Sequence, residues 1–168
     1  MLQHVFAFTV PAAYALLTRE MASPEATAML LAVGTQESRF EFRRQIHGPA
    51  GGFWQFEVGG VQAVLNHHAT QAPIVRVLQM LKYEPTIDGE LIQPVLEDND
   101  VLACCFARCL LWASPLRLGG PQEARQAWDL YLSCWRPGKP HVDSWADAYT
   151  DAWDLVLGGR TLPTELHA

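Results

Sequence analysis

Hydrophobic residues recur along the chain at offsets of three and four positions, which is the period of an α-helix. No stretch alternates between hydrophobic and polar residues as a half-buried strand does, and there is no internal repeat or low-complexity linker. Breaks rich in Pro, Gly and Asp separate the helical patterns. We expect seven or eight helices with short connections, over residues 1–20 (best formed from residue 12), 24–40, 61–68, 71–82, 90–96, 101–113, 121–135 and 145–157.

Residues 101–113 differ from the other segments because hydrophobic side chains cover almost every face of the expected helix. A helix of this kind is buried on all sides, so we expect it at the centre of the fold. Asp98 or Asn99 is its expected N-cap. The whole pattern predicts one all-α domain spanning residues 1–168, with a disordered tail over residues 160–168.

The composition is that of a globular protein, with 49% hydrophobic residues and a mean hydropathy of +0.02. No apolar run is long enough to cross a bilayer. Residues 5–17 are apolar, but no basic region precedes them and Pro11 interrupts them, so they do not resemble a secretory signal. We therefore expect synthesis in the cytoplasm without a signal peptide, and no membrane insertion.

The formal net charge of −6 disfavours nucleic-acid binding, which requires a basic surface. Four cysteines occur, none in a Cys-x-x-Cys pair, and we expect them to be reduced and buried as small hydrophobic residues. They are Cys104, Cys105, Cys109 and Cys134. Their spacing relative to the histidines does not match the usual zinc patterns, so neither a metal nor a cofactor is expected.

Glu37 lies at the end of the second expected helix, whose start is marked by Ser23 as N-cap and Pro24 at the first helical position. It follows Leu30 and Val33 at helical spacing and therefore falls on the apolar stripe. Burial disfavours the charged form of a carboxylate and raises its pKa. A carboxylic acid that is protonated near neutral pH can act as a general acid. The alternative is a structural glutamate that bends outward or bonds a loop amide.

Two short runs flank the loop that follows this helix. Residues 37–40 read Glu-Ser-Arg-Phe, and residues 52–55 read Gly-Phe-Trp-Gln. Gln55 follows Glu37 by eighteen positions (55 − 37), and Ala50 lies five positions before Gln55. In order and spacing, these runs resemble the catalytic region of the lytic transglycosylases and goose-type lysozymes, whose pattern is Glu-Ser-x-Phe, a loop, and Gly-Leu-Met-Gln. Two aromatic residues replace the leucine and methionine here.

The resemblance implies an α-helical, lysozyme-like fold and an enzyme that cleaves the glycan strand of peptidoglycan. Glu37 would protonate the glycosidic oxygen between two wall sugars. Ser38 and Gln55 would hydrogen-bond the glycan from the cleft wall, and Gly52 would let the backbone approach the sugar closely. A tight turn is the alternative role for the glycine. Trp54 is the expected platform on which a sugar ring stacks.

The family also carries a tyrosine beside the acid, often in a Tyr-Asn-x-Gly run. Tyr131 is the candidate here, although Leu132 replaces the asparagine, and Tyr149 is a rival. Alternatively, either tyrosine packs in the core with its hydroxyl at the surface. Trp112 and Trp128 occupy apolar positions of expected helices, so we expect them in the core.

Glu57 is the second candidate carboxylate, because goose-type lysozymes carry an acid two residues after the glutamine. A second carboxylate would activate water in an inverting hydrolase. Lytic transglycosylases do without one, because the 6-hydroxyl of the substrate closes an anhydro ring. Alternatively, Glu57 is a solvated residue at a helix start.

Two segments are expected at the rim of the cleft. The first is a basic patch of Arg39, Arg43 and Arg44, which would partly offset the acidic net charge against an anionic polymer. The second is the loop over residues 136–140, which Trp135 flanks.

The sequence thus predicts a peptidoglycan-cleaving lytic transglycosylase, encoded by a phage or prophage. It would reach the periplasmic cell wall through the phage lysis machinery or the virion, with virion components as further partners. Three alternatives remain: a muramidase hydrolase that uses Glu57, a catalytically silent lysozyme-like virion or glycan-binding module, and a hydrolase that acts on chitin or chitosan. The missing Tyr-Asn-x-Gly run and the acidic charge favour the silent module.

Overall fold

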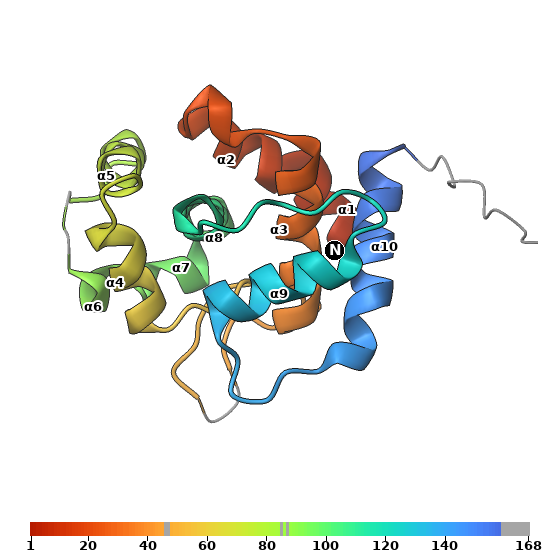
Figure 1. The fold of residues 1–168 in the computed structure, drawn as a ribbon. Coiled ribbons are helices and arrows are strands. Elements are labelled where there is room, and N and C mark those ends of the chain that lie inside the picture. The colour runs from red at the N-terminus through yellow and green to blue at the C-terminus, as the bar shows by residue number, and fades with distance from the viewer. Residues whose placement is uncertain (46–47, 85, 87, 159–168) are drawn as a thin grey trace, which may run out of the picture.

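A computed structural model describes residues 1–45, 48–84, 86 and 88–158, and every regular element in these residues is helical (Figure 1). The protein is therefore all-α, as predicted. The expected tail over residues 160–168 lies outside the described residues. The longer helices are α2 (Val10–Leu16), α3 (Pro24–Ser38), α4 (Val58–Asn66), α5 (Gln71–Met80), α8 (Asp100–Ala113), α9 (Ala124–Trp135) and α10 (Trp145–Val156). The short elements are α1 (Leu2–His4), α6 (Gly89–Ile92), α7 (Val95–Asp98), the π-helical η1 (Val5–Thr9) and the 3₁₀ turns η2 (Arg19–Met21) and η3 (Val142–Ser144).

Helix α8 lies in the middle of the molecule and packs against α2, α3, α4, α5, α7 and α9 (Figure 1). Asn99 caps it, because its side-chain oxygen accepts the Leu102 N–H at 2.9 Å. These contacts confirm the predicted central helix. Trp128 is buried as expected, but Trp112 is 40% exposed because the last turn of α8 leaves the core. The predicted core position of Trp112 is therefore wrong.

Helix α3 packs against α8 on one side and α10 on another, and it carries the first candidate site residue. Its start is the one predicted: the Ser23 hydroxyl accepts the Ala26 N–H at 3.1 Å, and Pro24 follows. Its end comes two residues early, at Ser38, because Arg39 adopts a left-handed conformation with φ 54°. The chain therefore turns sharply just after Glu37.

The turn is stabilised by Phe40, which folds back onto Gly34 of α3. A Cβ atom at Gly34 would lie 2.1 Å from Phe40 Cζ, so only glycine allows this packing. The loop beyond it contains two isolated β-bridges, Arg44 with Gly51 and Gly51 with Phe56. The loop itself is the one expected for this region.

Several boundaries differ from the predicted ones. The first segment is helical from Leu2 and ends at Leu16, where Leu17 is extended (φ −86°, ψ 178°). Helix α4 begins at Val58, three residues before the predicted start. The segment expected near residues 90–96 is two one-turn helices, α6 and α7, separated around Pro94, which has no N–H to donate.

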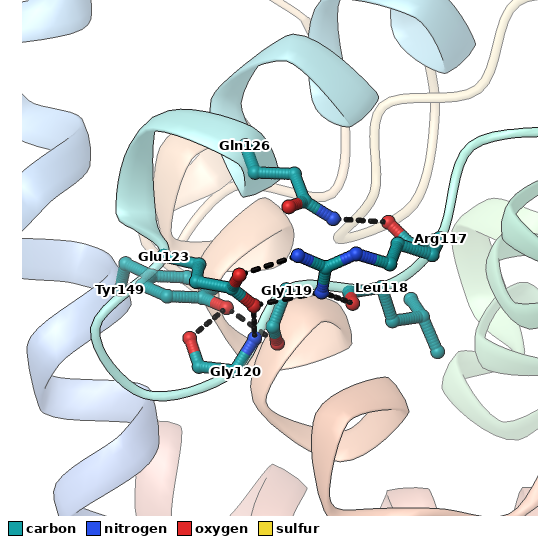
Figure 2. A network of polar contacts seen from close by, with 7 residues as sticks. All are labelled: Arg117, Leu118, Gly119, Gly120, Glu123, Gln126 and Tyr149. Atoms are coloured by element: carbon teal, nitrogen blue, oxygen red, sulfur yellow. Dashed lines mark hydrogen bonds and ion pairs between the residues drawn. The ribbon is translucent and has the colours of Figure 1, made fainter.

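Helix α9 begins at Ala124 and not at the predicted position 121, because Glu123 is occupied in a polar network (Figure 2). The Glu123 carboxylate accepts hydrogen bonds from the Gly120 N–H at 2.7 Å and from both terminal nitrogens of Arg117. Tyr149 of α10 directs its hydroxyl to Gly119 O at 2.8 Å. The network joins the connection between α8 and α9 to α10.

None of the helices in the described ranges combines the length and the apolar character that a membrane crossing requires. The four cysteines are free thiols. Cys104, Cys105 and Cys109 are buried, and Cys134 is half-buried.

Candidate active site

An open cleft of about 1090 Å³ lies between the end of α3, the loop after it, the end of α9 and the segment that joins α9 to α10. That loop and that segment project at the same end of the molecule (Figure 1). Four of the expected site residues line the cleft: Glu37, Gln55, Glu57 and Tyr131. Tyr131 is far from the other three in the chain, and the packing of α9 and α3 on α10 brings it to them.

Glu37 occupies the last turn of α3 and accepts a hydrogen bond from Tyr131 Oη, with 2.7 Å between the oxygens. Burial raises the pKa of Glu37 from 4.5 to about 7, and the Tyr131 hydrogen bond only partly opposes this effect. The direction is the one predicted from the apolar stripe. At neutral pH both forms of the carboxyl group are populated, so it can give a proton to a ligand and take one back.

Aromatic side chains from α9 and α10 hold Tyr131 in place. Its ring stacks on Trp145, with 5.2 Å between centroids and 18° between planes, and on Trp135, at 6.2 Å and 26°. The rival Tyr149 directs its hydroxyl to backbone carbonyls of the α8–α9 connection instead. The structure therefore places Tyr131, and not Tyr149, beside Glu37.

Ser38 lies behind the cleft wall and not on it. The residue is buried (5% exposed). Its hydroxyl donates to Phe53 O at 2.7 Å and accepts the Phe40 N–H at 3.1 Å. The expectation that Ser38 hydrogen-bonds a glycan is corrected, because these backbone groups occupy the hydroxyl. Ser38 ties the end of α3 to the run at residues 52–55, and so it positions Glu37 indirectly.

Trp54 and Gly52 also serve the scaffold. Trp54 is fully buried and donates its indole N–H to Leu30 O at 2.9 Å, so the expected stacking on a sugar ring is wrong. Gly52 is buried with φ 74°, and a Cβ there would lie 2.6 Å from Leu96 O. The glycine therefore permits a tight turn against α7, which was its alternative role, and does not bring the backbone to a sugar.

Gln55 and Glu57 remain on the cleft lining. Gln55 has a left-handed backbone (φ 49°) and donates its amide to Gly52 O at 2.9 Å, which leaves its amide oxygen as an acceptor. Glu57 occupies the N-cap position of α4, but its side chain accepts no capping hydrogen bond there. The exposed carboxylate fits either a second acid or a solvated helix-start residue.

Trp135 and Gln36 are among the cleft residues that were not predicted as site residues. Trp135 lines the cleft where the sequence suggested Trp54, and its indole N–H donates to Trp54 O at 2.8 Å. Its place beside the loop over residues 136–140 was the signal in the sequence. Gln36 lines the cleft next to Glu37 and donates its amide to His141 O at 2.9 Å. Nothing in the chain near Gln36 indicates that contact.

The basic patch expected at the rim is mostly neutralised. Arg43 binds Asp100 through two hydrogen bonds of 3.1 and 2.6 Å, and Arg44 binds Glu97 at 3.0 Å. Neither arginine lines the cleft, nor does Arg39. This expectation is therefore wrong, because acids of α7 and α8 draw both side chains away.

Comparisons of this chain with protein-family models, with curated proteins and with solved structures find no match. Within the described ranges, His, Cys, Asp and Glu side chains form no group of three or more that could hold a metal ion. The functional assignment therefore depends on the chemistry of the cleft and on the motif resemblance.

Proposed function

We propose that the protein is a lytic transglycosylase with a lysozyme-like fold, which cuts the β-1,4 bond between MurNAc and GlcNAc in peptidoglycan. The observation that carries the proposal is Glu37: a carboxyl group with a pKa of about 7, in an open cleft, hydrogen-bonded to Tyr131. An acid held half-protonated at neutral pH is costly for stability, and perturbed groups of this kind concentrate at functional sites.

In this reaction Glu37 begins as the neutral acid and gives its proton to the glycosidic oxygen as the bond to the anomeric carbon breaks. An oxocarbenium-like transition state forms on the sugar. The resulting Glu37 carboxylate then takes the proton of the 6-hydroxyl of the same sugar, whose oxygen bonds the anomeric carbon and closes the anhydro ring. Glu37 ends protonated, so the cycle is balanced. Proton transfer of this kind contributes about 10²- to 10⁴-fold in rate.

The other cleft residues have supporting roles. Tyr131 donates to Glu37 and holds the carboxyl group toward the cleft. Trp135 offers an indole surface on which a sugar ring stacks in place of the buried Trp54. Gln55 presents an amide oxygen to sugar hydroxyls. The protein would be phage- or prophage-encoded and reach the periplasmic wall through the lysis machinery or the virion, with virion components as partners.

A muramidase hydrolase is the second candidate, because Glu57 lines the same cleft as Glu37. In that reaction the Glu57 carboxylate would take a proton from water as the water oxygen attacks the anomeric carbon from the opposite face. The two reactions leave different ends on the glycan: an anhydro ring from transglycosylation and a reducing sugar from hydrolysis.

Mass spectrometry of the soluble products from purified peptidoglycan tests the proposal. We expect the unmodified protein to release anhydro-ended muropeptides and Glu37→Gln to release about 10²- to 10⁴-fold less. Glu90→Gln is the matched control, because it removes an exposed carboxylate that lies outside the cleft.

Reducing-ended products that disappear with Glu57→Gln would assign the hydrolase instead. No release by the unmodified protein, across several wall types, would overturn the enzyme assignment and favour the silent virion or glycan-binding module.

A further inference from the structure

The cleft is electrically asymmetric. Glu37 and Glu57 line the cleft from the end of α3 and the start of α4, and the segment over residues 136–141 lines the same cleft. Arg136, Lys139 and His141 of that segment all line the cleft and are exposed. We call these three residues the basic segment.

Within the part of the chain that the structure describes, the two cations of the basic segment line the cleft and have no carboxylate partner, unlike four other arginines of the protein. Arg43, Arg44, Arg117 and Arg125 form ion pairs with carboxylates. Among the described residues, Arg136 and Lys139 form no ion pair. In a chain with a net charge of −6, two unpaired cations on one wall of a cleft are available to a ligand.

These cations do not serve Glu37. Burial and the Tyr131 hydrogen bond set the pKa of Glu37, and neither Arg136 nor Lys139 is among the causes. A cation close to the carboxyl group would favour its charged form and lower the pKa. The basic segment is thus far enough from Glu37 to leave it a proton donor, yet it faces the same cleft.

The basic segment is also held in a defined position. Gln36, adjacent to Glu37, donates its amide to His141 O at 2.9 Å and accepts the Ser144 hydroxyl at 3.0 Å. Pro137 and Pro140 restrict the backbone between the cations. A preorganised segment loses little conformational entropy when a ligand binds, which favours a role in recognition.

We propose that the basic segment is a subsite for a carboxylate carried by the glycan, so that the cleft selects an acidic glycan over a neutral one of equal length. The proposal rests on the function proposed above, because it assumes that a glycan occupies the cleft. The carboxylate has two possible sources in peptidoglycan: the lactyl ether on the sugar, and the peptide attached to it.

The test is a binding titration, measured by fluorescence of Trp135 or by calorimetry. The Glu37→Gln protein is used so that the ligand is not cleaved during the titration. Four probes of matched length are compared: a chitin oligosaccharide, peptide-free glycan strands with free lactyl carboxylates, the same strands with those carboxylates amidated, and strands that keep their peptides. Arg136→Gln/Lys139→Gln is the test variant. Arg76→Gln is the matched control, since Arg76 is exposed on α5 and outside the cleft.

We expect the peptide-free strands to bind about two- to fivefold more tightly per engaged cation than the chitin or amidated probes, with the preference reduced in higher salt. The double variant should lose this preference and the Arg76 control should keep it. A preference that appears only with peptide-bearing strands would assign the peptide as the source of the carboxylate. Equal affinity for all four probes, or a preference that survives in the double variant, would overturn the proposal.

Product release by the unmodified protein is measured on the same probes and separates this inference from the proposed function. Cleavage together with equal affinity for strands with and without free carboxylates, the peptide-bearing strands included, would retain the enzyme and overturn the subsite. Carboxylate-dependent binding without cleavage would retain the subsite and overturn the enzyme. Neither binding nor cleavage would overturn both.

Discussion

Glu37 and Glu123 have opposite electrostatic surroundings. Glu37 is shielded from water and has one hydrogen-bond donor, Tyr131, and its pKa is raised to about 7. Glu123 is open to water and has donors from Arg117 and the Gly120 N–H, and its pKa is lowered to about 2. The first carboxyl group is available for proton transfer at neutral pH. The second is charged at neutral pH and binds Arg117 and the Gly120 N–H (Figure 2).

The two regions are physically connected. Tyr131, beside Glu37, stacks on Trp145, and Trp145 stacks on Tyr149 with 5.9 Å between centroids. Tyr149 in turn directs its hydroxyl to the α8–α9 connection that Glu123 clamps. The Glu123 network therefore helps to fix how α9 packs on α10, and this packing holds Tyr131 against Glu37. The charged, hydrogen-bonded Glu123 thus supports the structure around the buried Glu37.

The largest expected effect concerns stability against pH in Glu37→Gln. The pKa of Glu37 lies above that of the unfolded chain, so the native state binds the proton more tightly, and stability is lost as the pH rises from about 4.5 to about 7. Above pH 7 the free energy of unfolding is lower than near pH 4 by at most about 3 kcal/mol, and residual contact of Glu37 with solvent makes this difference smaller. We expect urea unfolding to show Glu37→Gln more stable than the unmodified protein by about 2 kcal/mol at pH 8, and equal to it near pH 4.

Glu123→Gln should change stability in the opposite direction to Glu37→Gln. The pKa of Glu123 is depressed, so its contribution to stability is present above about pH 4.5 and is lost as the pH falls toward 2. The variant should be less stable than the unmodified protein at pH 7, with the gap closing in acid. If both glutamine variants changed stability in the same direction at pH 8, the contrast between the two carboxylates would be broken.

A smaller effect is expected for Tyr131→Phe, which removes the hydroxyl that donates to Glu37. Because that hydrogen bond favours the charged form, its loss should raise the pKa of Glu37 by about one unit, the equivalent of about 1.4 kcal/mol. A carbon NMR titration of the Glu37 carboxyl group measures this shift directly. The alkaline limb of the cleavage rate should move upward with it, whereas a uniform loss of rate at all pH values would indicate that Tyr131 only supports the packing.

Tyr149→Phe should have the smallest effect. It removes the hydroxyl bonded to Gly119 O and leaves the ring in the stack, so we expect a loss of about 1 kcal/mol in the free energy of unfolding. Muropeptide release at a temperature well below unfolding should be unchanged. Because Tyr149 is the sequence rival of Tyr131, a large loss of activity in this variant would reverse the assignment of the tyrosine.

Local patterns account for much of the fold that the sequence predicted. The central position of α8 follows from apolar residues on all its faces, and the start of α3 follows from Ser23 and Pro24. The burial of Glu37 follows from its place on the apolar stripe of α3. Each of these features depends on residues within a few positions of one another, which is why they can be read without a structure.

Only the tertiary structure showed whether each motif residue faces the cleft or the core. Ser38 and Trp54 belong to the runs that resemble a glycan-cleaving site, yet both face the core, because Phe53 O and Leu30 O accept their hydrogen bonds. Trp54 lies in an irregular run, which has no periodicity from which the direction of a side chain can be predicted, and Ser38 is the last residue of α3, where the chain leaves the helix. Trp135, which does line the cleft, lies far along the chain from that run.

Composition and helical periodicity thus determined the all-α class, the central helix and the environment of the acid. Only the packing of α9 and α10 against α3 decided that Tyr131, 94 residues from Glu37, donates to it, and that the basic segment faces the same cleft. Helix formation depends on neighbours in the chain, whereas a cleft depends on where distant helices cross. For this protein, local patterns determined that Glu37 is buried, and the crossing of distant helices determined its hydrogen-bond partner and the other residues of the cleft.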